Sequence, residues 1–191
     1  MAAPEPAKNA FLIRHREKED FNQYWYSSHT ISKIVQELLS CSQKAAFLST
    51  PSVYFSLPKG SSLRQNSWVL DFDTQWASDP HFVKYDFNSP LALPADLHHA
   101  FDCVVIDPPF ITREVWQHYA ATARLLLQPQ GGKVIASTVA ENAPLMEELL
   151  GVKPVAFRPS IPHLVYQYNF FTSHEPSADG LGAANPEVPD A

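Results

Sequence analysis

One short stretch constrains this chain more than any other, because it ends a buried strand on a rigid acidic turn. Residues 101–110 read FDCVVIDPPF, and the apolar run Cys103–Ile106 within them predicts a buried strand. Two prolines end that strand at once, because proline has no N–H group to donate to a sheet ladder. Asp107 and Phe110 therefore lie just beyond the carboxyl end of the strand. Open α/β sheets bind their ligands at this edge.

The surrounding chain alternates between helical and extended patterns. Apolar residues at helical spacing predict helices over residues 30–41, 112–127 and 141–150. Short apolar or alternating runs predict strands over 45–49, 67–73, 81–87, 103–106 and 133–137, and a closing antiparallel pair over 154–158 and 164–172. Such alternation indicates an α/β fold with a mostly parallel sheet that helices cover on both faces.

Length and local composition predict one folded domain between two tails. A chain of 191 residues is typical of a single domain, which we place at residues 11–173. Residues 1–10 are rich in alanine and proline, so we expect a flexible N-terminus. Residues 174–191 carry Gly, Pro, Ala and acids with little apolar content, which predicts a disordered C-terminal tail.

Charge and cysteine content narrow the class of partner and the compartment. The net charge of −6 argues against broad electrostatic binding to nucleic acid and fits a basic protein partner better. Cys41 and Cys103 fall on a predicted helix and in the core strand, so we expect buried thiols in a reducing compartment. Since no signal-peptide core or membrane-spanning run is apparent, we expect a cytoplasmic protein, with the nucleus as the alternative.

The acidic turn suits one kind of chemistry, the attack of an amine on an electrophilic methyl group. The carboxylate of Asp107 is able to accept a hydrogen bond from the amine and to stabilise its growing positive charge. The carbonyl of Pro108 offers a second acceptor, and Pro109 stiffens the turn that holds both. The ring of Phe110 offers a face for stacking or for cation–π attraction. The alternative is a strand exit with a helix-capping aspartate and a core phenylalanine.

Polar residues follow three other predicted strands. An acid at the end of the second strand of such a fold typically receives the ribose hydroxyls of a nucleoside, and Asp71 and Asp73 are both candidates. Asp86, after the third strand, is placed to accept from an adenine amino group, although turn-initiating or capping roles are common for aspartate. After the first strand, small hydrogen-bonding groups take the place of the usual glycine cluster: Ser49, Thr50, Pro51 and Ser52.

Trp25 and Tyr26 belong to a dense aromatic cluster, which predicts either a lid over a flat ligand or an anchor for the N-terminal segment.

We expect no metal site, because the adjacent His98 and His99 point apart on most backbones and have no helically spaced partner.

Taken in order, several segments resemble a known family. They are Gln23–Ser27, Ser52–Tyr54, Asp71–Asp73, Tyr85–Leu91 and Asp107–Phe110. Over residues 20–172 the chain resembles the family first labelled as probable adenine-amino methyltransferases. The best-understood members of that family are lysine methyltransferases that act on translation elongation factor 1-alpha. The family often has tyrosine where Phe110 stands, a change that removes a hydroxyl and keeps the aromatic face.

This resemblance implies a fold, a cofactor and an activity. The implied fold is the Rossmann-like class I methyltransferase fold, a mostly parallel seven-stranded sheet with a C-terminal antiparallel hairpin. The implied cofactor is S-adenosylmethionine, and the implied activity is protein-lysine N-methylation, with elongation factor 1-alpha as the partner. The expected catalytic residues are Asp107, Pro108, Pro109 and Phe110. The expected cofactor-binding residues are Trp25, Tyr26, Ser49, Thr50, Pro51, Ser52, Asp71, Asp73, Asp86 and Asp107.

Two alternatives stay open at this point. The Asp-Pro-Pro-Phe motif also occurs in enzymes that methylate adenine N6 in DNA or RNA, which would require a base flipped into the pocket. A catalytically silent methyltransferase fold that serves as a binding module is the other. The sequence leaves the oligomeric state open.

Overall fold

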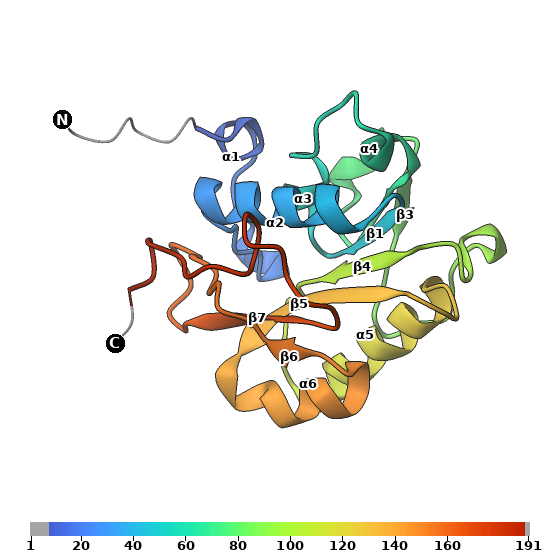
Figure 1. Ribbon diagram of the computed structural model, residues 1–191. Coiled ribbons are helices and arrows are strands. Elements are labelled where there is room, and N and C mark those ends of the chain that lie inside the picture. Colours follow the sequence, from blue (N-terminus) through green and yellow to red (C-terminus); the bar gives the residue numbers. More distant parts are fainter. Residues whose placement is uncertain (1–7, 190–191) are drawn as a thin grey trace.

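The computed structural model describes residues 8–189, which fold around one seven-stranded sheet (Figure 1). The strand order is β3-β2-β1-β4-β5-β7-β6, with all pairs from β3 to β5 parallel and β7 antiparallel to both neighbours. The strands are β1 (Ala45–Leu48), β2 (Trp68–Asp71), β3 (Phe82–Lys84), β4 (Cys103–Ile106), β5 (Lys133–Val139), β6 (Lys153–Pro154) and β7 (Tyr168–Thr172). This arrangement confirms the predicted Rossmann-like architecture.

Helices cover both faces of the sheet (Figure 1). They are α1 (Ala10–Arg14), α2 (Ser28–Cys41), α3 (Pro51–Tyr54), α4 (Ser62–Asn66), α5 (Arg113–Leu126) and α6 (Ala143–Leu150), with 3-10 turns η1 (Glu19–Phe21), η2 (Thr74–Trp76), η3 (Ala95–Leu97) and η4 (Ala140–Asn142). No helix within residues 8–189 is long and apolar enough to cross a membrane.

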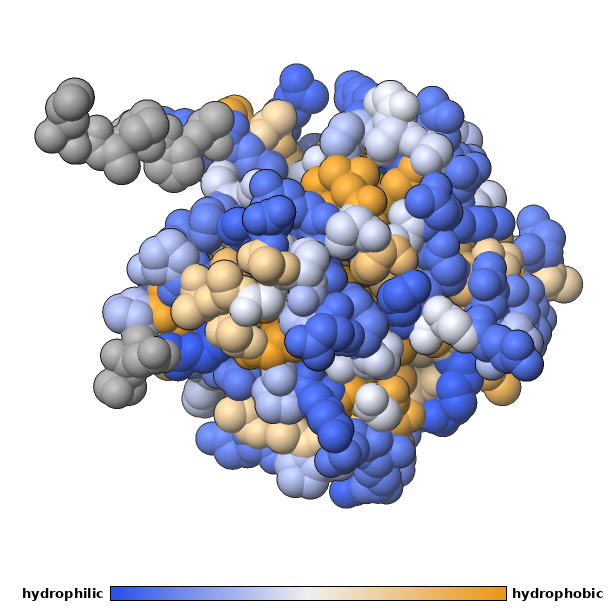
Figure 2. All heavy atoms as spheres, in the orientation of Figure 1, coloured by the Kyte–Doolittle hydropathy of each residue, from blue (hydrophilic) through white to orange (hydrophobic). Residues whose placement is uncertain are grey.

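Alternate residues of the central strands pack into two separate hydrophobic cores, one on each face of the sheet. On one face Phe47 and Val105 pack with Ile31 of α2, and on the other Leu48 and Ile106 pack with Trp116 of α5. This follows from the period of two in a strand, which sends successive side chains to opposite faces. Most of the face in Figure 2 is accordingly hydrophilic, with apolar side chains in separate patches.

Capping residues mark the ends of the helices. Ser27 caps α2, where its Oγ accepts a hydrogen bond from Thr30 N at 3.1 Å. Thr112 caps α5 in the same way, with a bond from Val115 N at 3.3 Å. Gly151 ends α6 in the left-handed conformation (φ 64°), which a residue with a side chain adopts at a cost.

Several predicted strands are shorter in the structure. β2 ends at Asp71 and β3 at Lys84, because the polar residues that follow turn toward the carboxyl edge. β6 keeps only two residues, and just after it Val155 N still donates to Phe170 O of β7 at 3.0 Å. The predicted closing pair does form, and β7 lies between β5 and β6.

The predicted disorder of the C-terminal tail differs from what the structure describes. Residues 174–189 pack against the domain, with Leu181 fully buried and Asn185 nearly so. The carboxylate of Glu37 on α2 holds this segment, accepting bonds from Ser177 N at 2.9 Å and Leu181 N at 3.1 Å. The composition of the tail did not reveal this packing, because the residue that anchors the tail, Glu37, lies outside it on α2. Most of the predicted flexible N-terminus (residues 1–7) and the last two residues of the predicted tail lie outside the described residues.

Candidate active site

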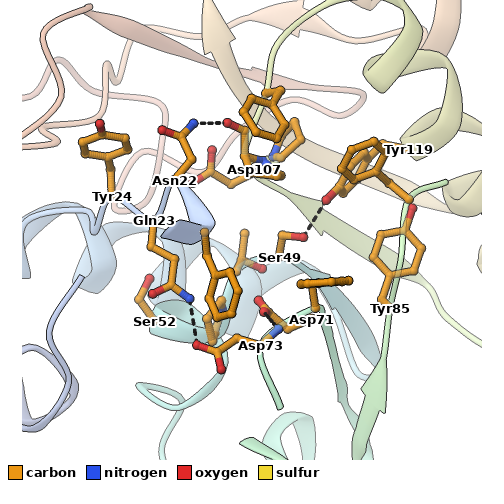
Figure 3. A pocket seen from close by; sticks show the side chains of 18 of the residues that line it. Asn22, Gln23, Tyr24, Ser49, Ser52, Asp71, Asp73, Tyr85, Asp107 and Tyr119 are labelled. Atoms are coloured by element: carbon orange, nitrogen blue, oxygen red, sulfur yellow. Dashed lines mark hydrogen bonds between the residues drawn. The ribbon is translucent and has the colours of Figure 1, made fainter. Parts of the chain in front are cut away.

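A cavity of about 230 Å³ opens at the carboxyl ends of the central parallel strands. Figure 3 shows Ser49, Asp71 and Asp107 reaching it from the ends of β1, β2 and β4. The strand order reverses here, since β1 lies between β2 and β4. Such a reversal separates the loops on either side and leaves a crevice for a ligand.

Asp107 lines this cavity, and hydrogen bonds to β1 and β5 hold it in place. Its backbone N–H donates to Leu48 O at 3.2 Å, which fixes the turn against β1. Ser137 on β5 donates from Oγ to Asp107 Oδ1 at 2.9 Å, and the hydroxyl of Tyr26 lies 2.6 Å from the same Ser137 Oγ. Because the Ser137 proton is given to Asp107, the Tyr26 hydroxyl must donate to Ser137. The three side chains form a directed hydrogen-bond chain that ends on the carboxylate.

The protonation of Asp107 is tuned to neutral pH. Burial raises its pKa to about 7, and the neighbouring hydroxyls of Ser137 and Tyr26 oppose that rise. Burial, together with the nearby Asp107 charge, raises the pKa of Tyr26 well above its usual value. The phenol therefore stays protonated and remains a donor.

The two prolines and Phe110 extend from Asp107 along the cavity wall. Asn22 Nδ2 donates to the carbonyl of Pro109. Pro108 also lines the cavity, and among the described residues no hydrogen bond to its carbonyl is found. The ring of Phe110 is 51% exposed and meets Phe87 edge-on at 6.4 Å. The motif thus offers a carboxylate, a carbonyl and an aromatic face to one space.

The loop after β1 turns without glycine. Ser49 takes the left-handed conformation (φ 56°), and its Oγ is 2.7 Å from the hydroxyl of Tyr119 on α5. Thr50 and Ser52 are buried beside it, and Pro51 begins α3. All four predicted loop residues line the cavity. A serine held by a tyrosine replaces the usual glycine at the strained position.

Asp71 and Asp73 both line the cavity but have different environments. Burial raises the pKa of Asp71 to about 7, and its Oδ1 accepts the backbone N–H of Asp73 at 2.8 Å. Asp73 instead binds protein donors, with Lys18 Nζ at 2.9 Å and Gln23 Nε2 at 3.1 Å. Burial alone would raise the pKa of Asp73, but these bonds and that from Gln75 lower it. Asp71 is thus the acid whose carboxylate is open to a ligand.

Of the remaining predicted residues, two line the cavity and one lies behind it. Asp86 lines the cavity and accepts from Asn88 N at 2.9 Å, a turn geometry that leaves it half-buried. Trp25 also lines the cavity and packs edge-on against Phe11 at 5.2 Å, so it serves as an anchor as well. Tyr26 does not line the cavity. It lies behind Asp107, beside Phe170 at 5.5 Å.

Sequence reasoning missed residues from distant segments that line the cavity or contact Asp107. Ser137 sits on the strand next to β4, and its place beside Asp107 follows only from the register of β4 with β5. Asn22, Gln23 and Tyr24 come from the segment before α2, and none of the three was among the predicted site residues. Other lining residues that were not predicted include Tyr85, Tyr119, Leu164 and Tyr168. Tyr119 and Tyr168 carried no local signal, because each falls within an ordinary apolar pattern.

Comparison with known proteins agrees with this geometry. Residues 17–176 match the family described as "Probable N6-adenine methyltransferase". "EEF1A lysine methyltransferase 1" of Danio rerio is 34% identical over 163 residues, which cover 81% of this chain and 96% of the relative. The human protein of the same name is 29% identical over 169 residues, covering 85% of this chain and 78% of the relative.

Solved structures share the fold at low sequence identity. A branched-chain polyamine synthase from Thermus thermophilus aligns with a TM-score of 0.60 and 12% identity, over 91% of this chain and 64% of that one. A precorrin-6y C5,15-methyltransferase from Geobacter metallireducens aligns with a TM-score of 0.53 and 14% identity, over 87% and 97%. The match over residues 17–176 and the likeness to the Danio rerio protein show that this chain belongs to the family described as probable N6-adenine methyltransferases, whose curated members similar to it are named lysine methyltransferases.

Proposed function

We propose that this protein is an S-adenosylmethionine-dependent protein-lysine N-methyltransferase that modifies translation elongation factor 1-alpha. The observation that carries the proposal is Asp107, a carboxylate with a raised pKa that faces the cavity beside the free carbonyl of Pro108. The names of the curated relatives favour lysine over adenine as the target. The net charge of −6 also disfavours a phosphate backbone as the partner.

The cavity residues fit the proposed cofactor. Asp71 offers a buried carboxylate oxygen at the end of β2, where ribose hydroxyls would donate to it. Asp86 offers an acceptor for an adenine amino group, and Ser49 and Ser52 offer small polar groups after β1. When bound, the cofactor supplies a methyl group on a sulfonium, which is electrophilic without help from a metal.

The chain's own residues prepare the amine. A lysine side chain has an ordinary pKa of about 10.4 and must lose a proton before it can attack. Transfer into a half-buried site favours its neutral form. Asp107 would then accept an N–H of the amine, and the carbonyl of Pro108 a second one, which orients the lone pair. As positive charge grows on the nitrogen, the Asp107 carboxylate stabilises it.

The rim of the cavity suits a polypeptide. Phe110 and Leu164 line the opening, and the neighbouring Val165 and Tyr166 are 91% and 68% exposed. Exposed apolar groups around a polar centre match an aliphatic lysine stem on a protein surface better than a charged phosphate. The proposed substrate also implies a cytoplasmic enzyme, since translation factors act there.

A labelling experiment tests the proposal. The protein is incubated with radiolabelled S-adenosylmethionine and either purified elongation factor 1-alpha or adenine-containing DNA and RNA. Asp107→Asn keeps the shape of the side chain and removes its charge, and Asp96→Asn, at an exposed position of η3, is the matched control. We expect label on the protein substrate with wild type and Asp96→Asn, and a loss of at least about a hundredfold with Asp107→Asn.

Other outcomes have distinct meanings. Label on nucleic acid alone would replace the lysine function with adenine methylation. If no substrate is labelled and a titration shows no cofactor binding, the proposal is refuted. The catalytically silent methyltransferase fold is then the remaining alternative.

A further inference from the structure

A pair of thiols lies away from the cavity, at the opposite end of the central strands. Cys41 ends α2 and Cys103 begins β4, and both are free. The two residues are brought together where Ser42, next to Cys41, donates from Oγ to the carboxylate of Asp102, next to Cys103. Cys41 is partly exposed, whereas Cys103 is fully buried. A reagent in solvent can therefore reach the Cys41 side chain but not the Cys103 side chain.

An imidazole and a carboxylate complete this cluster. His174 donates from Nε2 to Glu37 Oε1 at 2.8 Å and also contacts the Cys41 thiol. The ligand atoms of Glu37, Cys41 and His174 lie within 4.8 Å of one another. The other ring nitrogen of His174, Nδ1, is buried and makes no hydrogen bond within the described part of the chain.

The charges of the cluster favour a thiolate on Cys41. The contacts of His174 with Cys41 and Glu37 raise the pKa of the imidazole to about 9. The hydrogen bond from Cys103 and the neighbouring imidazolium lower the pKa of Cys41 to about 6, against the effects of burial and of the Glu37 charge. The contact with Cys41, and burial, raise the pKa of Cys103, so it stays protonated and donates to the thiolate.

A thiol, an imidazole and a carboxylate also resemble a metal-ligand set. The hydrogen bonds of Glu37 argue for a proton network instead. Its Oε2 accepts from Ser177 N, Ser177 Oγ and Leu181 N at 2.9, 2.8 and 3.1 Å, while its Oε1 pairs with His174. Both oxygens are thus committed to protein donors, and a metal would have to displace the bond between Glu37 and His174.

We propose that Cys41 is a peroxide-reactive thiol whose oxidation forms a disulfide with Cys103. The Cys41 thiolate attacks one oxygen of hydrogen peroxide and breaks the O–O bond, giving a sulfenic acid and a hydroxide that is protonated to water. The sulfur of Cys103 then attacks the Cys41 sulfur and displaces hydroxide, which leaves as water with the Cys103 proton. Two thiols and one peroxide become one disulfide and two waters.

This site is independent of the proposed methyltransferase activity, and it connects to the rest of the fold. The disulfide would tie the end of α2 to the start of β4, the four-residue strand that leads directly to Asp107. It would also change the contact that holds His174, and with it the start of segment 174–189.

Thiol chemistry on the full chain tests the proposal. Iodoacetamide labelling at pH 7 is followed by mass spectrometry for wild type, His174→Gln and the matched control His98→Gln. We expect label on Cys41 well before Cys103, a rate about five- to tenfold lower in His174→Gln, and no change in the control. Equal rates in wild type and His174→Gln would overturn the assignment.

Peroxide treatment provides the second readout. We expect a reductant-reversible linkage between the peptides of Cys41 and Cys103, and none in Cys41→Ser. In Cys103→Ala we expect a sulfenic acid on Cys41 that dimedone traps. If Cys103→Ala fails to fold, Cys41→Ser still tests the idea, because its Cys103 must stay unreactive toward peroxide. A wild-type chain in which Cys41 reaches the sulfinic acid with no linkage to Cys103 would refute the disulfide.

Discussion

Ser137→Ala perturbs the proposed active site without touching its surface. The Ser137 hydroxyl is fully buried and donates to Asp107 Oδ1 at 2.9 Å. Its removal leaves the carboxylate without this donor and the buried Tyr26 hydroxyl without its acceptor. A hydrogen bond to a charged group contributes about 1.5–3 kcal/mol. If the whole of that is lost from the reacting state, methyl transfer at pH 7 falls by about ten- to a hundredfold.

The same bond also affects the pH dependence of the reaction. Ser137 opposes the rise in the Asp107 pKa that burial causes, so its loss raises a pKa of about 7 further. A change of about 1.4 kcal/mol corresponds to one pKa unit, so we expect the acid limb of kcat/KM to move upward by about one unit. Part of the lost activity should therefore return at pH 8.5, where the carboxylate is again ionised.

The assay is methyl transfer to elongation factor 1-alpha between pH 5.5 and 9, with Ser78→Ala, at an exposed serine, as the control. A Ser137 that only supported packing would lower the rate by the same factor at every pH. A uniform fall, or an unchanged profile, would refute the role assigned to the hydrogen-bond chain.

Three further variants test the energetics of the fold and site. Tyr26→Phe should lower the free energy of unfolding in urea by about 1–2 kcal/mol, because it leaves Ser137 without its donor, whereas the exposed Tyr166→Phe should leave that free energy unchanged. Asp71→Asn should flatten the pH dependence of stability. The native carboxyl, with a pKa of about 7 against 3.8, binds more protons than the unfolded one, so the free energy of unfolding of the wild type falls as pH rises from about 4 to 7, by at most about 4 kcal/mol from this group. A slope equal to that of the wild type would contradict this. Leu181→Ala should cost about 2–4 kcal/mol in thermal or urea unfolding because Leu181 is fully buried, and an unchanged melting temperature would show that residues 174–189 do not pack as described.

The sequence by itself determined the features that depend on neighbouring residues. The apolar run before Asp107 and the prolines after it required a buried strand that ends there, since their constraint acts within a few bonds. The order of strands and helices along the chain was likewise readable from local periods, and the order of the motifs resembled a known family. Those patterns also placed Ser49, Asp71 and Asp107 at one edge, because the carboxyl ends of parallel strands converge.

Only the tertiary structure decided the contacts between distant segments. Tyr26 and Ser137 are 111 residues apart, and their hydrogen bond depends on the register of β5 and the docking of the segment before α2. Glu37 and Leu181 are 144 residues apart, and their bond turns a polar tail into packed structure. Such pairs cannot be predicted from local composition. A hydrogen bond between distant residues forms only when the folded backbone brings its two partners together.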